Sequence, residues 1–80
     1  MDMREAVANR IIELCDNKKI TPNALSYIAG VPQSTIKSIL NNESKNPGIV
    51  TIKMICDGLE INISEFFNTD VFRNLEQEIE

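Results

Sequence analysis

Between residues 33 and 41 the chain carries six polar side chains that fall outside the apolar positions of a helix. They are Gln33, Ser34, Thr35, Lys37, Ser38 and Asn41. Amide side chains can pair with adenine through two hydrogen bonds, hydroxyls can donate or accept, and lysine can reach guanine or phosphate. A helix face that is only solvated more often carries Glu–Lys pairs, whereas this face has no acid before Glu43. These residue types therefore favour hydrogen bonding to base edges in the major groove of DNA.

The composition leaves little room for catalytic chemistry. The chain has 80 residues, no histidine and three glycines. These counts exclude a Ser-His-Asp triad, a Cys-His pair, a histidine metal site and a glycine-rich phosphate loop. Ser34 and Lys37 match the S-x-x-K pattern of penicillin-binding enzymes, but its companion motifs are missing. Asp57, Glu60 and Glu65 lack the spacing of a calcium loop and are more simply a solvated acidic face. We therefore expect no catalytic residue, no metal and no cofactor.

The two cysteines, Cys15 and Cys56, lie 41 positions apart without a CxxC motif. Free cysteine is among the residues most often buried as a small apolar side chain, and this is the simpler reading here. A disulfide bridge or a redox switch is the alternative.

Apolar periodicity predicts five helices and no strand, within one small domain. The helices are expected over residues 3–17, from Pro22 to Gly30, from Pro32 or Gln33 to about Leu40, over about residues 49–59, and from Ile63 onward. The longest apolar runs have two or three residues, so we expect no membrane span. The first residues lack a signal-peptide pattern, so we expect an intracellular protein.

The second and third of these helices form a helix-turn-helix pattern. Thr21 can cap the second helix, and Pro22 suits its first position because a proline there loses no hydrogen bond. Gly30 suits a sharp turn with a positive φ angle. Only Val31 then precedes the next breaker, Pro32, and its apolar side chain is expected to anchor the turn in the core.

Residues 20–40, ITPNALSYIAGVPQSTIKSIL, resemble the lambda-repressor-like (XRE, Cro-type) helix-turn-helix family. The resemblance continues through residues 46–47, 51–59 and 63–67, and covers about residues 8–67. It implies an all-α, five-helix DNA-binding domain that usually binds a two-fold operator as a dimer. It also implies that five of the polar residues named above face base edges, namely Gln33, Ser34, Thr35, Lys37 and Ser38. We expect Asn41 to face base edges as well. The side chains expected at phosphates are Thr21, Asn23, Asn42, Lys45 and Asn46.

Three positions depart from the family pattern. Pro22 stands where many relatives have a glutamine that touches phosphate, so we expect the backbone N–H groups of Asn23 and Ala24 to serve instead. Lys19 and Glu60 stand where relatives often have glycine. Both helix ends are therefore expected to be strained or differently capped.

The net charge of −4 is unevenly distributed along the chain. Residues 18–53 hold five lysines and one glutamate, a net charge of +4. Residues 1–17 carry a net charge of −2 and residues 54–80 a net charge of −6. We therefore expect a basic DNA-facing segment, with most acids far enough from the DNA for salt to screen them.

The C-terminal aromatic cluster of Phe66, Phe67 and Phe72 permits two interpretations. The rings can close the core, or one or two of them can be covered by a second copy. We assign residues 1–70 to the DNA-binding domain. Residues 71–80 form an extension with a frayed acidic tail, in which Phe72 and Leu75 are expected to make a dimer contact.

These observations predict a sequence-specific, double-stranded DNA-binding transcriptional regulator, a repressor that acts as a homodimer in the cytoplasm of a bacterial or phage system. No enzyme activity, membrane contact or small-molecule ligand is expected. The alternative is a protein-interaction module on the same fold, antitoxin-like or an adaptor, that uses its acidic, aromatic C-terminal part.

Overall fold

The computed structural model describes residues 1–44 and 46–79, and the regular structure in this part of the chain is entirely helical. The helices are α1 (Met3–Lys18), α2 (Pro22–Ala29), α3 (Gln33–Leu40), α4 (Ile49–Gly58), α5 (Ile63–Phe67) and α6 (Asp70–Arg73). The predicted all-α fold is confirmed. The expected fifth helix is divided into α5 and the single turn α6.

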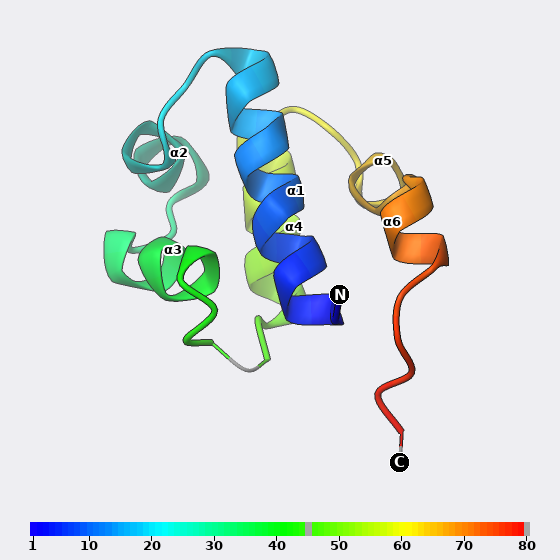
Figure 1. Cartoon of the computed structure of the whole chain (residues 1–80). Helices are drawn as coiled ribbons and strands as arrows, with labels where there is room; N and C mark the ends of the chain where they lie inside the picture. Colours follow the sequence, from blue (N-terminus) through cyan, green and yellow to red (C-terminus); the bar gives the residue numbers. More distant parts are fainter. Residues whose placement is uncertain (45, 80) are drawn as a thin grey trace.

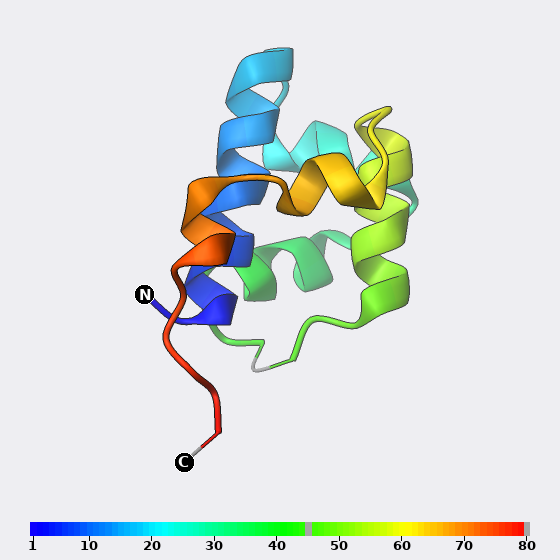
Figure 2. The ribbon, with the colours of Figure 1, turned by 90° about the vertical axis from the view of Figure 1, so that its right-hand side faces the viewer.

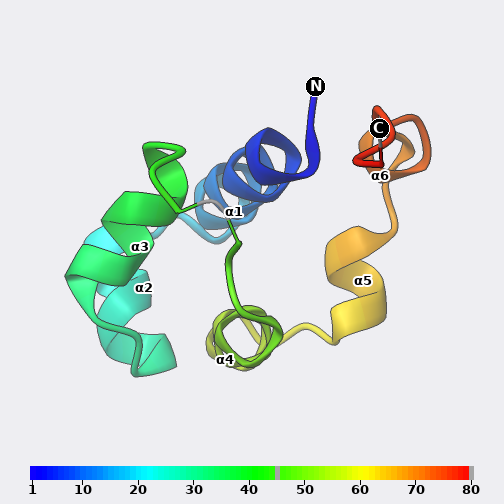
Figure 3. The ribbon, with the colours of Figure 1, turned by 90° about the horizontal axis from the view of Figure 1, so that it is seen from below.

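The helices form a ring around one core. Helix α1 contacts α2, α3 and α6, whereas α4 contacts α2 and α5. Figures 1 and 3 show α2 and α3 on one side of α1 and α4, with α5 and α6 on the other side. In Figure 2, α5 (yellow to orange) extends from α4 towards α1. The helix-turn-helix pair and the C-terminal helices therefore occupy opposite sides of the molecule.

Apolar side chains from α1 to α5 fill the core. The side chains of Ile11, Leu25, Ile55 and Phe66 have no exposed surface. Val31, in the turn between α2 and α3, is also buried and belongs to the same cluster. The core therefore fixes the angle between α2 and α3 through the connecting turn as well as through the helices.

The ends of α2 follow the sequence prediction. The Thr21 hydroxyl oxygen caps the first turn by accepting a hydrogen bond from the backbone N–H of Ala24, and Pro22 is the first helical residue. Gly30 ends the helix with a φ angle of +69°. A capping box of Asn62 and Glu65 likewise starts α5 as expected.

Three other helix ends adopt the left-handed conformation without glycine, and that of Asn42 after α3 is described with the candidate site. Lys19 has a φ angle of +57° after α1, and Glu60 has a φ angle of +59° after α4. This conformation brings Cβ close to the backbone in every residue except glycine. Lys19 and Glu60 thus adopt the conformation that a glycine would adopt there, and the strain expected at these two positions stays a prediction.

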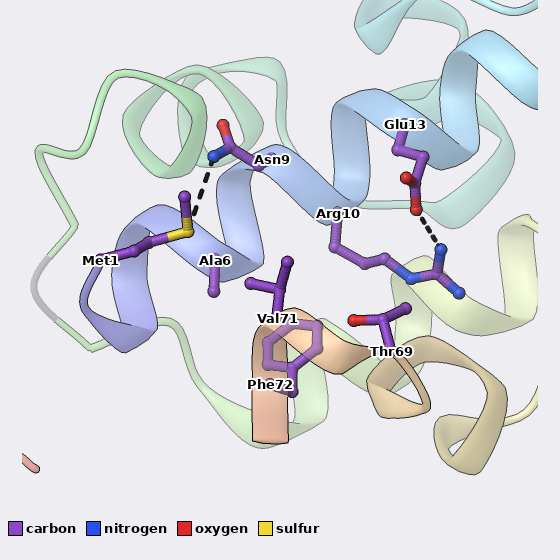
Figure 4. Close-up of a pocket in the computed structure, with 8 residues that line it drawn as sticks. All are labelled: Met1, Ala6, Asn9, Arg10, Glu13, Thr69, Val71 and Phe72. Atoms are coloured by element: carbon purple, nitrogen blue, oxygen red, sulfur yellow. Dashed lines mark hydrogen bonds and ion pairs between the residues drawn. The ribbon is translucent and has the colours of Figure 1, made fainter. Parts of the chain in front are cut away.

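Arg10 of α1 bonds two carbonyls at the end of α5, where the chain breaks before α6. Its guanidinium donates to the backbone carbonyls of Phe66 and Glu65, both at 2.8 Å, and also pairs with Glu13. Figure 4 shows Arg10 reaching across from α1 beside the start of α6. Carbonyls at the end of a helix need partners, and here another helix supplies them.

Helices α2 and α4 approach closely at Gly58. A Cβ atom added there would lie 2.9 Å from Cβ and 3.0 Å from Cα of Ala29. Real side chains do not pack at such distances, so the crossing of the two helices requires glycine at this position.

Both cysteines are free and buried, in agreement with the simpler reading of the sequence. Burial raises the pKa of the Cys15 thiol, and a smaller contribution comes from Asp16. Burial likewise raises the pKa of the Cys56 thiol, with a smaller contribution from Asp57. Both side chains therefore remain in the neutral, apolar form that suits the core.

Candidate nucleic-acid interface

Helix α3 presents a polar face because its apolar residues are turned into the core. Ile36 and Ile39 are each only 2 % exposed. The polar residues predicted for base contact divide into two groups by exposure. The exposed ones are Gln33, Ser34, Lys37 and Asn41, and the half-buried ones are Thr35 and Ser38.

One flank of α3 faces the beginning of α2. A groove of about 450 Å³ runs between the two helices. It is lined by Pro22 and Asn23 from the start of α2, and by Gln33, Ser34, Ile36, Lys37, Leu40 and Asn41 along and just after α3. The amides and the lysine ammonium therefore share the flank that adjoins the positive end of the α2 dipole.

The other flank of α3 faces the loop that follows it. The backbone N–H groups of Glu43 and Ser44 both donate to the Ser38 carbonyl, at 2.9 and 3.2 Å. This fold-back follows Asn42, which has a φ angle of +58°. A shallow hollow of about 360 Å³ results, lined by Ser34, Thr35, Ser38, Glu43 and Ser44.

Ser34 lines both flanks and thus lies on the ridge between them. The sequence predicted base contacts for Thr35 and Ser38 as well as for Gln33. In the fold, the loop after α3 closes over the carbonyl end of this helix, and Thr35 and Ser38 are less exposed than Gln33. Glu43, the one acid in residues 18–53, also lines the second flank, although it was not among the residues predicted from the sequence.

Two of the residues predicted at phosphates lie at the start of α2. Thr21 and Asn23 are both exposed there. The Thr21 oxygen accepts from the Ala24 N–H at 3.1 Å, which leaves the Thr21 hydroxyl hydrogen able to donate. The expectation that the Ala24 N–H would serve a phosphate is wrong, because the cap already uses this donor. The Asn23 N–H remains the backbone candidate.

The remaining predicted phosphate residues lie in the loop after α3. Asn42 and Asn46 are exposed. Lys45 lies outside the described residues. Lys53, counted in the basic segment, forms an ion pair with Asp57 one turn along α4, so part of its charge is compensated locally.

The residues expected at a dimer contact lie away from this face. The Phe72 ring is half-buried against Phe67, with ring centroids 5.0 Å apart, and 6.2 Å from the fully buried Phe66. Leu75 is also half-buried. The aromatic cluster thus belongs largely to the core of this chain.

Other hollows and clusters offer less chemistry. A cavity of about 100 Å³ between α1 and α6 is lined by Ala6, Arg10, Val71 and Phe72, among others (Figure 4). The Arg10 guanidinium is already engaged there, because it donates to the Phe66 carbonyl. Within residues 1–44 and 46–79, no three His, Cys, Asp or Glu side chains gather in a way that could hold a metal ion. In the same part of the chain, none of the helices has the length and apolar character needed to span a membrane.

Comparison with known proteins agrees with this geometry. The model of the Cro/C1-type HTH DNA-binding domain matches residues 10–70. The crystal structure of the prophage Lp1 protein 11 is similar, with a TM-score of 0.83 and 30 % identity, over 94 % of this chain and 100 % of that chain. An HTH_3 family transcriptional regulator from Vibrio cholerae has a TM-score of 0.73 and 30 % identity, over 80 % of this chain and 35 % of its own. A search of curated proteins found no match.

Proposed function

The chain belongs to the Cro/C1-type helix-turn-helix DNA-binding family, and we propose that it is a sequence-specific transcriptional repressor. In this proposal it binds a two-fold operator in double-stranded DNA as a homodimer and excludes other proteins from the promoter by occupying it. It acts in the cytoplasm, where bacterial and phage DNA is accessible. The regulatory role named for the Vibrio cholerae protein supports the general function.

One observation carries the proposal: the exposed surface of α3 is polar and adjoins the start of α2. Gln33, Lys37 and Asn41 line the groove beside α2, whereas Ile36 and Ile39 anchor the helix in the core. Side chains on a rigid helix that fits the major groove can discriminate bases by their hydrogen bonds. The start of α2 supplies Thr21 and Asn23 for phosphate contacts that set the position of α3.

The modest size of a single reading helix supports binding as a dimer. An eight-residue α3 reaches only a few base pairs, and two copies double the number of base and phosphate contacts. We place Phe72 and Leu75 at the contact between the copies, on the C-terminal side of the molecule. Half-sites in the operator would then lie about one helical turn of DNA apart.

The direct test is selection of bound fragments from genomic DNA by the purified protein at about 0.15 M salt, a concentration at which non-specific binding is weakened. We expect enrichment of a short two-fold motif. Recovery of no motif from folded protein would contradict the proposal and favour a protein-interaction role. A motif without two-fold symmetry would support DNA binding by this protein but contradict binding as a dimer.

A further inference from the structure

Glu43 occupies an unusual position for an acid on a DNA-facing surface. It is the one acidic residue between Lys18 and Lys53, and its side chain is exposed. Phosphate groups repel a carboxylate, so an acid beside DNA lowers affinity unless it contacts a hydrogen-bond donor. The donors that a base pair offers in the major groove are the exocyclic amino groups, N4 of cytosine and N6 of adenine.

The loop holds Glu43 beside α3 and does not extend it away from the helix. The Glu43 N–H donates to the Ser38 carbonyl at 2.9 Å, and Glu43 lines the hollow shared with Ser34 and Thr35. Its carboxylate also approaches the amide nitrogen of Asn41, at 3.5 Å. Because its backbone is bonded to the carbonyl end of α3, Glu43 moves with the reading helix when the helix enters the groove.

The two flanks of α3 consequently differ in chemistry. The flank beside α2 presents the Lys37 ammonium and the amides of Gln33 and Asn41, which suit the acceptors of purines. The flank beside the loop presents hydroxyls and a carboxylate, and a carboxylate can only accept. An acceptor-only group discriminates strongly, because a base that offers an acceptor at the same place is repelled.

We infer that Glu43 is a specificity-determining residue that accepts a hydrogen bond from the exocyclic amino group of a cytosine or adenine in each half-site. The inference rests on the proposed function and extends it to a residue outside α3.

The test compares base preferences at every operator position for the wild-type protein, Glu43→Gln, Glu43→Asp and the control Glu60→Gln. Selection from a randomised DNA library supplies the preferences, and direct titration supplies the affinities. Glu60→Gln removes the same charge from the exposed turn after α4, which leads towards α5 in Figure 1 (yellow). Thermal melting of each variant verifies folding.

We expect the wild-type protein to favour cytosine or adenine at one position of each half-site, and the favoured base identifies which amino group is read. Glu43→Gln should reduce this preference by about 5- to 150-fold, the range typical of a good base contact, and leave other positions unchanged. Glu43→Asp keeps the charge but shortens the side chain, so it should lose the preference without a general gain in affinity. Glu60→Gln should retain every preference.

A uniform gain in affinity for Glu43→Gln, with every base preference retained, would overturn the inference. It would show that Glu43 acts only as a charge that repels phosphate. Failure of the proposed function itself is distinguishable from this result. It would appear earlier, as the absence of any motif enriched by the wild-type protein.

Discussion

Lys37 is the exposed cation on the flank of α3 that faces α2, and its role can be separated from that of a general positive charge. If its ammonium contacts a base, Lys37→Ala should cost about 1–3 kcal/mol on operator DNA and much less on scrambled DNA. If it contacts phosphate, the loss should be smaller and equal on both. Competition binding on the two DNAs measures the difference.

Lys53→Ala is the matched control for this change. Lys53 is an exposed lysine too, but it pairs with Asp57 on α4. Exposed ion pairs contribute little, so this variant should retain operator preference and nearly full affinity. Full affinity of Lys37→Ala on both DNAs would rule out either role for Lys37.

The left-handed residues Lys19 and Glu60 provide a second test at the scale of single residues. Glycine adopts this conformation without steric cost, so Lys19→Gly and Glu60→Gly should each raise the free energy of unfolding by about 1 kcal/mol. In a domain of this size the melting temperature should rise by about 4–8 °C for each. Thermal unfolding followed by circular dichroism measures the shift.

Lys18→Gly supplies the comparison, because Lys18 is the last residue of α1 and has helical geometry. Glycine in a helix costs about 0.5–1 kcal/mol, so this variant should melt at a lower temperature. Destabilisation by all three glycines alike would show that strain at Lys19 and Glu60 is negligible.

The raised pKa values of the two buried thiols predict how stability changes with pH. A thiol whose pKa is higher in the folded protein than in the unfolded chain favours the folded state while it stays protonated. This contribution is present below the ordinary pKa of 9.0 and is lost as the pH rises above it. Cys15 and Cys56 should therefore react with alkylating reagents only after denaturation at pH 8, and stability should decline above pH 9. Rapid labelling of the native protein at pH 8 would contradict their burial.

At the scale of elements, local signals predicted α2 and α3 well. The Thr21 cap and the Gly30 turn act within a few residues of the chain, so the sequence displays them directly. The division between α5 and α6 has only a weak local signal, the polar run Asn68-Thr69-Asp70, and it also involves a distant part of the chain. The carbonyls of Glu65 and Phe66 are bonded by Arg10, more than fifty positions away in the sequence. Only the folded arrangement brings these groups together.

The sequence predicted the candidate site about as well as it predicted the helices. Helical periodicity identified the outward residues of α3, but it could not divide them into two flanks. That division depends on Asn42, whose left-handed conformation turns the loop back onto the Ser38 carbonyl. The same turn places Glu43 beside Ser34, a proximity that sequence spacing alone does not reveal.

The crossing of α2 and α4 positions the helix-turn-helix pair. A substitution at Gly58 tests how closely the two helices approach. Gly58→Ala would place Cβ against Cβ and Cα of Ala29, so the helices must separate. Such overpacking typically costs about 1–3 kcal/mol. Gly48→Ala is the control, since its Cβ would lie 3.8 Å from the Thr51 hydroxyl oxygen at an ordinary distance. Chemical denaturation should show a clear loss of stability for the first variant alone. Equal stability of both would contradict the close approach.

For the molecule as a whole, the proposed dimer can be tested through Leu75. Phe72 contributes to the core of its own chain, so Leu75→Glu separates association from folding more cleanly. We expect this variant to sediment as a monomer at concentrations where the wild-type protein is a dimer, and to lose operator affinity. Ile12→Glu introduces the same charge at a partly exposed apolar residue of α1 and should still dimerise. Dimerisation of Leu75→Glu with wild-type affinity would contradict the assigned interface.

The arrangement of charge explains how an acidic protein can bind DNA. The segment around α2 and α3 carries a net charge of +4, whereas residues 54–80 carry −6 and include α5 and α6 on the opposite side. Repulsion by these acids is screened over about 8 Å at physiological salt. If a dimer neutralises about six phosphates, the logarithm of affinity should fall with the logarithm of salt concentration with a slope of about −5.

The central claim is that the exposed face of α3 reads DNA sequence, and amide chemical-shift mapping tests it most directly. The protein, labelled with nitrogen-15, is titrated with its selected DNA and with a scrambled duplex. We predict the largest shifts between Gln33 and Glu43, with smaller ones from Thr21 to Asn23, and a response of α3 that differs between the two duplexes. Shifts concentrated from Phe66 to Leu75, with α3 unchanged, would contradict the claim and assign recognition to the C-terminal side.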